Sequence, residues 1–434
     1  MKTHITISAL LLSCALLPNN AFAADLGGDC CADLEERVAE LEATTVRKGN
    51  RKVSLEVSGH VNTGVLYWDD GVEENVYVVD NAQDRSRFRF RGKAKIDGDW
   101  QAGFLIELGA RAARSDRVTA DIDDTNDGID LRHANWFIES KTYGRLTVGQ
   151  GSQATDGITQ INLAGINHVS RSQVFDWNGN FDIRQGSGTS DVRWRDLAIR
   201  ENPGEGNRNN LVRYDTPTFA GFTASAAWGE DDVWDVALRY ATEFQGFKLA
   251  GGIGYGVLTE ADGGGTLCID FDGAECQQFS VNVSVLHTAS GLFANFVYGQ
   301  IEDENRIAAA SANFTAARVE DQDEFYWVQA GLQQKWTTLG KSTIYGEYYR
   351  GEFGTPTRLN DDGLVRGRQV GGLDISSSEV DMWGFGFNQT IDAAAMDLFI
   401  GYRNYEADVT LEDGSTAAGL QDFQAVLAGG IIKF

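Results

Sequence analysis

Alternation of apolar and polar residues with a period of two constrains this chain more than any other feature. In the first such segment, the odd positions from Val53 to Val65 are mostly apolar and the even positions from Ser54 to Asn62 are polar. This pattern is typical of a strand with one apolar and one polar face. We predict sixteen such strands, at about 53–65, 85–97, 99–111, 129–140, 144–151, 210–216, 221–229, 232–242, 246–257, 277–288, 291–301, 323–335, 340–350, 378–389, 395–408 and 421–434.

The connections between these segments are unequal in length. Tight connections at 97–98, 141–143, 217–220, 244–245, 288–290 and 336–339 alternate with mostly long, polar ones. Short turns on one side and long loops on the other are the layout of outer-membrane barrels, and strands of about ten residues suit a tilted membrane crossing. The sequence therefore predicts an all-β fold, a 16-stranded antiparallel transmembrane β-barrel over residues 53–434.

Aromatic residues near the segment ends favour a membrane barrel over a soluble sandwich, because membrane barrels carry interfacial girdles. We expect this belt to contain Trp68, Trp100, Trp136, Tyr143, Phe219, Trp228 and Tyr349. After the N-terminal segment there is no apolar run of 18 residues, which argues against a helical membrane protein. A formal net charge of -26 argues against nucleic acid as a partner, because phosphate contacts need a basic face.

One strand shows which face meets water. Arg87, Arg89, Arg91, Lys93 and Lys95 share one face of the segment 85–97, opposite Phe88 and Phe90. A Lys or Arg that faces lipid at mid-depth costs about 2–4 kcal/mol, so this basic face must line a water-filled interior. Arg111, Arg132 and Arg145 are further candidates for the lumen; for Arg132 the poor alternation from Leu131 to Ile138 leaves the register open.

The N-terminus predicts export. Residues 1–23 combine Lys2, an apolar run and the sequence Ala21-Phe22-Ala23, as in a cleaved secretory signal peptide. Residues 24–52 form a separate periplasmic segment, in which Leu34, Val38, Leu41 and Thr45 have the spacing of a short coiled coil formed by several copies. A frayed polar helix remains the alternative.

The cysteines fit an oxidising compartment. Cys268 and Cys276 flank a polar stretch and could form a local disulfide, although free thiols remain an alternative, and the role of Cys30 and Cys31 is open. No spacing predicts a metal site or a cofactor. The acidic run 121–128 lacks the closing Glu of an EF-hand, so a solvated loop is favoured over calcium binding.

The longest connection, at 152–209, lacks clear strand periodicity, and connections of this length are usually functional or disordered. It mixes arginines with acids, among them Asp156, Asp176, Asp182 and Asp191.

Several stretches resemble the alpha-proteobacterial (Rhizobiales-type) family of trimeric outer-membrane porins. They are DCCADLEERVAELEATTVRKGNRKVSLEVSGHVN (29–62), RFRFRGKAKI (87–96), YGRLTVGQGSQATDGI (143–158) and RYDTPTFAGF (213–222), and Phe434 resembles the C-terminal assembly signal of bacterial barrels. The resemblance implies a homotrimer in which the long third loop folds inward as a constriction. It further implies that the basic wall faces acids of that loop, but Gln160 and Asn162 stand where acids are expected.

We therefore predict a porin of the bacterial outer membrane, in contact with lipid and lipopolysaccharide, that passes small hydrophilic solutes and ions by passive diffusion. A structural anchor or adhesin is one alternative. A sugar-type channel is another, with Tyr345, Tyr349 and Phe399 on inward faces but no continuous aromatic track. No HExxH or GxSxG motif indicates an enzyme.

Overall fold

The computed structural model describes residues 52–110, 112–124, 128–198, 202–229, 233–258, 276–303, 320–359 and 365–434. The chain divides into two compact units, Met1–Arg51 and Lys52–Phe434. The predicted signal peptide and coiled coil fall in the first unit, outside the described residues. Among the described residues, no helix is long and apolar enough to cross a membrane.

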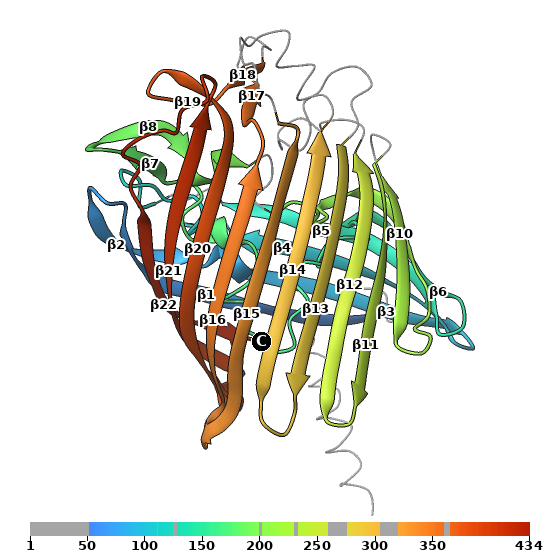
Figure 1. The fold of residues 1–434 in the computed structure, drawn as a ribbon. Coiled ribbons are helices and arrows are strands. Elements are labelled where there is room, and N and C mark those ends of the chain that lie inside the picture. The colour runs from blue at the N-terminus through green and yellow to red at the C-terminus, as the bar shows by residue number, and fades with distance from the viewer. Residues whose placement is uncertain are drawn as a thin grey trace, which may run out of the picture. The chain divides into compact units, whose positions relative to one another are not determined.

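Antiparallel strands are the main elements of the second unit (Figure 1). The strands that cross the barrel wall are β1 (Ser54–Asp69), β3 (Arg87–Asp97), β4 (Trp100–Ala110), β5 (Ile129–Ser140), β6 (Gly144–Ser152), β9 (Arg208–Asp215), β10 (Phe222–Gly229), β11 (Trp234–Phe244), β12 (Phe247–Leu258), β13 (Cys276–His287), β14 (Leu292–Asp303), β15 (Gln322–Thr337), β16 (Gly340–Phe353), β20 (Leu373–Ile391), β21 (Met396–Leu411) and β22 (Phe423–Lys433).

Each of these sixteen strands pairs with the next in this order, and β22 pairs with β1, from His60↔Lys433 to Asp69↔Gln424, so the barrel is closed. The predicted sixteen-stranded antiparallel barrel is confirmed, and the predicted strand ends agree with the structure to within five residues. Closure leaves no open edge across most of the wall, as a membrane barrel requires.

Short elements lie in the connections. They are β2 (Glu74–Asp80), β7 (Asp182–Gln185), β8 (Gly188–Arg193), β17 (Thr357–Leu359), β18 (Val365–Gly367), β19 (Gln369–Val370) and the 3₁₀ turns Ala82–Asp84, Val174–Asp176, Trp194–Leu197 and Asp392–Ala394. Short turns such as Gly98-Asp99 and Gln245-Gly246 lie at one end of the barrel, and the long connections lie at the other. By the usual layout of such barrels, the short-turn end is periplasmic.

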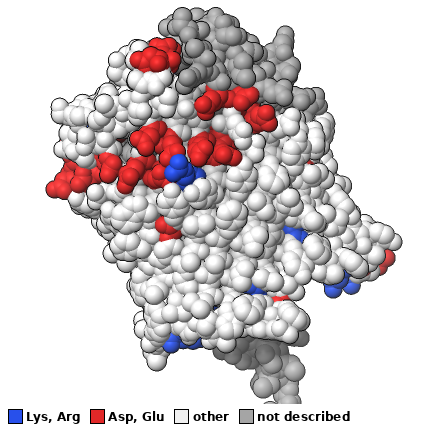
Figure 2. Space-filling model, in the orientation of Figure 1, with Lys and Arg blue, Asp and Glu red and all other residues white. Residues whose placement is uncertain are grey.

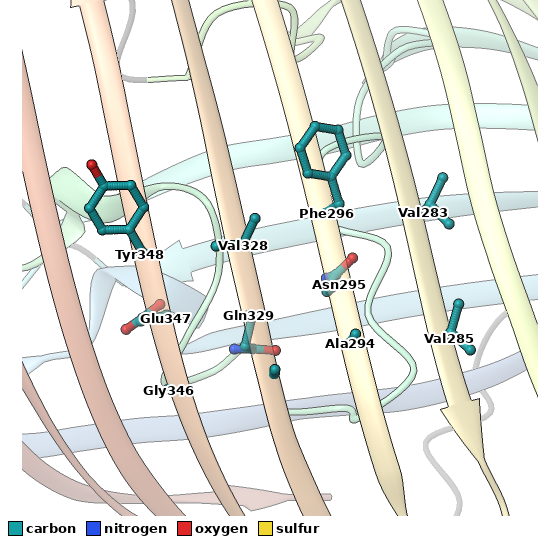
Figure 3. A pocket seen from close by; sticks show the side chains of 11 residues that line it. Val283, Val285, Ala294, Asn295, Phe296, Val328, Gln329, Gly346, Glu347 and Tyr348 are labelled. Carbon is teal, nitrogen blue, oxygen red and sulfur yellow. The ribbon is translucent and has the colours of Figure 1, made fainter.

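The two faces of the wall differ as predicted. On β13, β14 and β15 the outward side chains Val283, Phe296 and Val328 are 49%, 44% and 37% exposed, whereas Asn295 and Gln329 are buried on the inner side. Figure 3 shows this alternation around a shallow apolar depression of the outer wall, with a volume of about 680 Å³. Its floor consists of small residues that pair across three strands, Ala294, Ala330 and Gly346.

The aromatic belt is only partly as predicted. Trp136, Tyr143, Phe219 and Trp228 are 52% to 82% exposed on the outer wall, and Trp100 stacks on Tyr143. For two residues the prediction is wrong.

Trp68 and Tyr349 are almost fully buried on the inner face. Trp68 packs against Phe181, and Tyr349 packs against Phe175. Near the long-loop end, residues of the connection between β6 and β9 cover the inner wall, so inward positions there are apolar too. In these strands, an aromatic residue in the sequence therefore does not indicate whether its side chain faces the lipid or the inside of the barrel.

The largest apolar core lies where that connection meets the wall. Val174, Phe175, Trp177 and Phe181 are fully buried, and they cluster with inward residues of β15, β16, β21 and β22 such as Tyr405. Glycines of the wall make room for this packing: a Cβ on Gly401 would lie 2.8 Å from the Trp177 ring.

Candidate functional site

The basic face of β3 points to the inner side of the barrel. Arg87 lies opposite His60 on β1, which is buried, and Arg89 lies opposite Glu107 on β4, which is also buried. The side chains of Arg91, Lys93 and Lys95 are exposed on the same face. Since the outer wall is apolar at these strands, the alternation places the five bases on the water side of the wall.

Glu107 gathers several of these bases. It accepts a hydrogen bond from Arg89, lies 2.5 Å from Arg132 Nε and lies 3.7 Å from Arg87 Nη1, and it is only 3% exposed. A single buried carboxylate therefore offsets part of the charge of three arginines. Asp84, which precedes β3, binds Arg87 at 2.5 Å, and the neighbouring cations lower the pKa of Asp84 despite its burial.

A bulge explains why the register of Arg132 cannot be determined from sequence. Glu107 pairs with His133, but the next residue, Leu108, pairs with Leu131, so Arg132 is the extra residue of β5. An extra residue in one strand redirects the side chains around it. Arg132 reaches Glu107 on the inner side, and Leu131 is 52% exposed.

A second carboxylate lies nearer the short turns. Glu139 on β5 is 3.7 Å from Lys93 Nζ and 3.6 Å from Arg145 Nη1. The guanidinium of Arg145 also lies over the ring of Phe137, 3.8 Å from its centroid. Arg145 is thus on the same inner face as the bases of β3.

Sequence reasoning missed the continuation of this wall on β9 and β11. Arg213 forms an ion pair with Asp215 at 2.7 Å, and Arg239 donates to the backbone carbonyls of Ala154 and Asp156 at 2.7 and 2.8 Å. The period-two alternation of the segment 210–216 could have indicated Arg213. In the structure Arg213 lies opposite Thr147 of β6, whose side chain faces inward.

The connection 153–207 is bound to the inner wall at its neck, the place where its first residues and its last residues lie side by side. Asp235 on β11 accepts hydrogen bonds from the backbone nitrogen and the hydroxyl of Thr155, at 2.6 and 2.7 Å. Near the other end, the carboxylate of Glu205 accepts from the backbone nitrogen and hydroxyl of Thr159, at 2.9 and 2.5 Å. Burial and the nearby Asp156 raise the pKa of Glu205 to about 7.

The middle of the connection binds the opposite side of the wall. Ser170 donates to Glu347 on β16 at 2.7 Å, and Arg403 on β21 donates to the backbone carbonyl of Val174 at 3.1 Å. His168 lies 2.8 Å from the Oδ1 of Asn388 on β20.

Two of the four predicted acids of this connection contact arginines. Asp176 pairs with Arg171 at 2.8 Å, although burial raises the pKa of Asp176, and Asp156 lies 3.7 Å from Arg208. Asp182 is half-buried in β7. Asp191 belongs to β8, but its side chain, like residue Arg111, lies outside the described part of the chain.

The remaining predicted sites are described only in part. Cys276 is fully buried and disulfide-bonded, whereas Cys268 lies outside the described ranges, so their pairing stays a prediction. Part of the acidic run, 125–127, also lies outside them. Within the described residues, no group of three or more His, Cys, Asp or Glu could hold a metal ion.

The fold resembles solved outer-membrane proteins. The anion-selective porin from Comamonas acidovorans aligns with a TM-score of 0.55 and 14% identity, over 88% of this chain and 100% of that chain. The trimer form of OmpT from Vibrio cholerae aligns with a TM-score of 0.50 and 11% identity, over 88% of this chain and 99% of that one. At these identities, the likeness shows the fold alone.

No curated protein sequence matches the chain. The family model of Gram-negative porins, however, matches residues 11–410, which is most of the chain and nearly all of the barrel. A closed barrel with a charged inner wall and an apolar outer wall is what a channel of this kind requires. The chain belongs to the Gram-negative porin family.

Proposed function

We propose that the connection 152–209 of this outer-membrane diffusion channel folds into the barrel and forms its constriction. The proposal rests on the observation that the connection contacts opposite sides of the inner wall. Its neck binds Asp235, and its middle binds Glu347 and Arg403. A segment fixed at both places narrows the lumen and so limits the size of the solutes that diffuse through it.

The open path then runs along the basic side of the wall. We assign the lining to Arg87, Arg89, Arg91, Lys93, Lys95, Arg132 and Arg145, with Arg111 as a further candidate. Support comes from the ion pairs that Glu107 forms with Arg87, Arg89 and Arg132, and from those that Glu139 forms with Lys93 and Arg145. Arg91 and Lys95 share the basic face of β3 with them. Asp156, Asp176, Asp182 and Asp191 belong to the facing connection, and charged groups at a constriction bias which ions pass.

Where acids are expected early in the connection, it carries amides, and these bind groups outside the basic wall. Gln160 binds Glu205 and Arg171, and Asn162 donates to Gln329 on β15 at 3.0 Å. Of its acids, Asp176 is engaged with Arg171 of the connection and Asp156 with Arg208 at the start of β9. The channel therefore departs from a simple arrangement of a basic wall opposite an acidic loop.

An aromatic sugar track is disfavoured. Tyr345, Tyr349 and Phe399 do face inward, but they are at most 5% exposed because they pack against the connection. A solute passing through the lumen would not reach these rings. General diffusion of small hydrophilic solutes is thus preferred over a sugar-type channel.

We further propose a homotrimer of the Rhizobiales-type subgroup, exported by a cleaved signal peptide at 1–23, with residues 24–52 forming a periplasmic coiled coil. The heptad and the quoted stretches support this assignment. The apolar outer wall would contact outer-membrane lipid and lipopolysaccharide.

Single-channel recording of the purified protein in a planar bilayer tests the proposal. We expect large ohmic conductance steps that occur in groups of three. Removing residues 24–45 should reduce the recovery of trimers without closing the channel. Folded protein that gives no conductance would contradict the channel, and single steps from a monomer would contradict only the trimer.

A further inference from the structure

The bases on the inner face of β3 fall into two sets. Arg87, Arg89 and Lys93 form ion pairs with Asp84, Glu107 and Glu139. Arg91 and Lys95 are exposed, and neither forms an ion pair within the ranges that the structure describes. The same strand therefore carries, on its water side, bases with and without an ion-pair partner among the described residues.

The two ends of β3 differ in position relative to the constriction proposed above. Residues 168–173 of the connection bind the segment just before β3: Asn81 donates to the carbonyl of His168 at 2.5 Å, and Gln83 donates to that of Gln173 at 2.6 Å. Arg87 follows this segment directly, whereas Lys95 lies at the other end of β3, beside the turn at Gly98. Along β3, Arg91 and Lys95 thus lie farther than Arg87 from these contacts, toward the short-turn end.

We propose that Arg91 and Lys95 set the ion preference of this channel and make it anion selective. The inference rests on the channel function and names the residues that discriminate among its permeant ions. Both side chains keep free N–H donors in the water path, so a passing anion can interact with them directly. A base that already binds a buried carboxylate has fewer donors to offer and a field that is partly cancelled.

Neighbouring charges do not reverse this preference. Glu56 on β1 lies opposite Arg91 and is also exposed, so it offsets one charge. Arg91 shares its face with the bases Arg89, Lys93 and Lys95 of the same strand. The exposed inner wall around β3 therefore remains basic.

The formal net charge of -26 is not a property of the lumen. Acidic side chains gather in a band across the outer surface, as Figure 2 shows. On β16 and β20 the outward residues Glu352, Glu379 and Asp381 surround Arg350. Charges outside the wall are screened within about 10 Å at 0.1 M salt, so they act weakly on an ion in the pore.

The zero-current potential across a planar bilayer in a KCl gradient tests the proposal. The wild-type channel should pass chloride in preference to potassium, and Arg91→Gln/Lys95→Gln should lose most of this preference. In water, a unit charge at about 7 Å acts with an energy near RT, so we expect a change of about threefold in the permeability ratio per removed charge at low salt. The variant should still insert and give channel steps in concentrated KCl, which shows that a pore is formed.

Two further variants make the test specific. Arg350→Gln removes one charge from the outer wall and should leave the permeability ratio unchanged. Arg91→Lys/Lys95→Arg keeps both charges and should keep the anion preference. A conducting wild-type channel that prefers potassium, or one whose preference survives Arg91→Gln/Lys95→Gln, would overturn the proposal. A wild-type protein without conductance would instead contradict the channel function itself.

Discussion

Arg403 and Glu347 meet inside the barrel although a whole strand separates them. Glu347 on β16 and Arg403 on β21 both lie opposite Gly384 of the intervening β20, and the two side chains join above this glycine. Arg403 Nε lies 2.9 Å from Glu347 Oε1, and Arg403 Nη2 lies 3.1 Å from Glu347 Oε2. Both side chains are at most 1% exposed. A side chain on Gly384 would fill the space that the ion pair occupies.

This pair also holds the proposed constriction. Arg403 donates to the carbonyls of Val174 and Arg171 and lies 4.5 Å from the centroid of the Trp177 ring. Glu347 accepts from Ser170. Two strands and the middle of the long connection therefore share one buried ion pair.

Arg403→Met should destabilise the protein and release the connection. Removing one partner of a buried ion pair leaves the other charge uncompensated, which costs about 3–5 kcal/mol. We expect a lower midpoint of thermal unfolding and noisier single-channel currents, because residues 170–177 lose their attachment. The double variant Glu347→Leu/Arg403→Met removes both charges and should recover part of the stability. Equal losses in the single and double variants would contradict a cost that arises from the unpaired charge.

Gly299→Ala should displace the other end of the connection. A Cβ at Gly299 on β14 would lie 2.0 Å from the backbone carbonyl oxygen of Pro203, so the backbone must shift. Overpacking of this kind costs about 1–3 kcal/mol. We expect a measurable change in single-channel conductance. Gly346→Ala is the matched control, because a Cβ there would meet only the carbonyl oxygen of Gly384, at 3.8 Å. A conductance identical in wild type and Gly299→Ala would show that the neck does not border the pore.

The barrel was predictable because each strand carries its own signal. Alternation marks the two faces, turn residues mark the ends, and the basic face of β3 identifies the water side. Each of these signals lies within about ten residues of sequence, so no knowledge of distant contacts was needed.

The inner contacts could not be predicted in the same way. Asn388 and His168 are separated by 220 positions, and Arg403 and Val174 by 229. The bulge at Arg132 depends on its pairing with β4, and Trp68 is buried only because Phe181 covers it. Each of these features arises when distant segments meet, and none leaves a local pattern in the sequence.

His168 should make the attachment of the connection sensitive to acid. Burial lowers the pKa of His168 from its ordinary value of 6.5, so the folded protein favours the neutral ring. Its surroundings are mixed, with Asp84 and Asp397 favouring the charged ring and Lys433 opposing it. The stabilisation is complete above pH 6.5 and is lost as the pH falls through the lowered pKa, because the unfolded chain binds the proton more readily.

Thermal unfolding and single-channel noise between pH 7.5 and pH 4 measure this effect. Wild-type protein should become less stable and noisier toward the acidic end. His168→Gln keeps an amide near Asn388 but cannot be protonated, so its acid-dependent loss should be smaller. His287→Gln, at the end of β13 beside a short turn, serves as the control and should behave as wild type. An equal acid-dependent loss in wild type and His168→Gln would assign the effect to other groups.

The disulfide of Cys276 should stabilise the barrel without shaping its pore. Cys276 begins β13 and is fully buried at the long-loop end of the wall. If its partner is Cys268, as we predict, the bond closes a loop of about nine residues, and chain-entropy arguments give about 2–3 kcal/mol of stabilisation. Cys276→Ser should therefore lower the free energy of unfolding by about this amount and leave the single-channel conductance unchanged. Peptide mapping without reductant identifies the partner directly, and a link from Cys276 to Cys30 or Cys31 would contradict the local pairing.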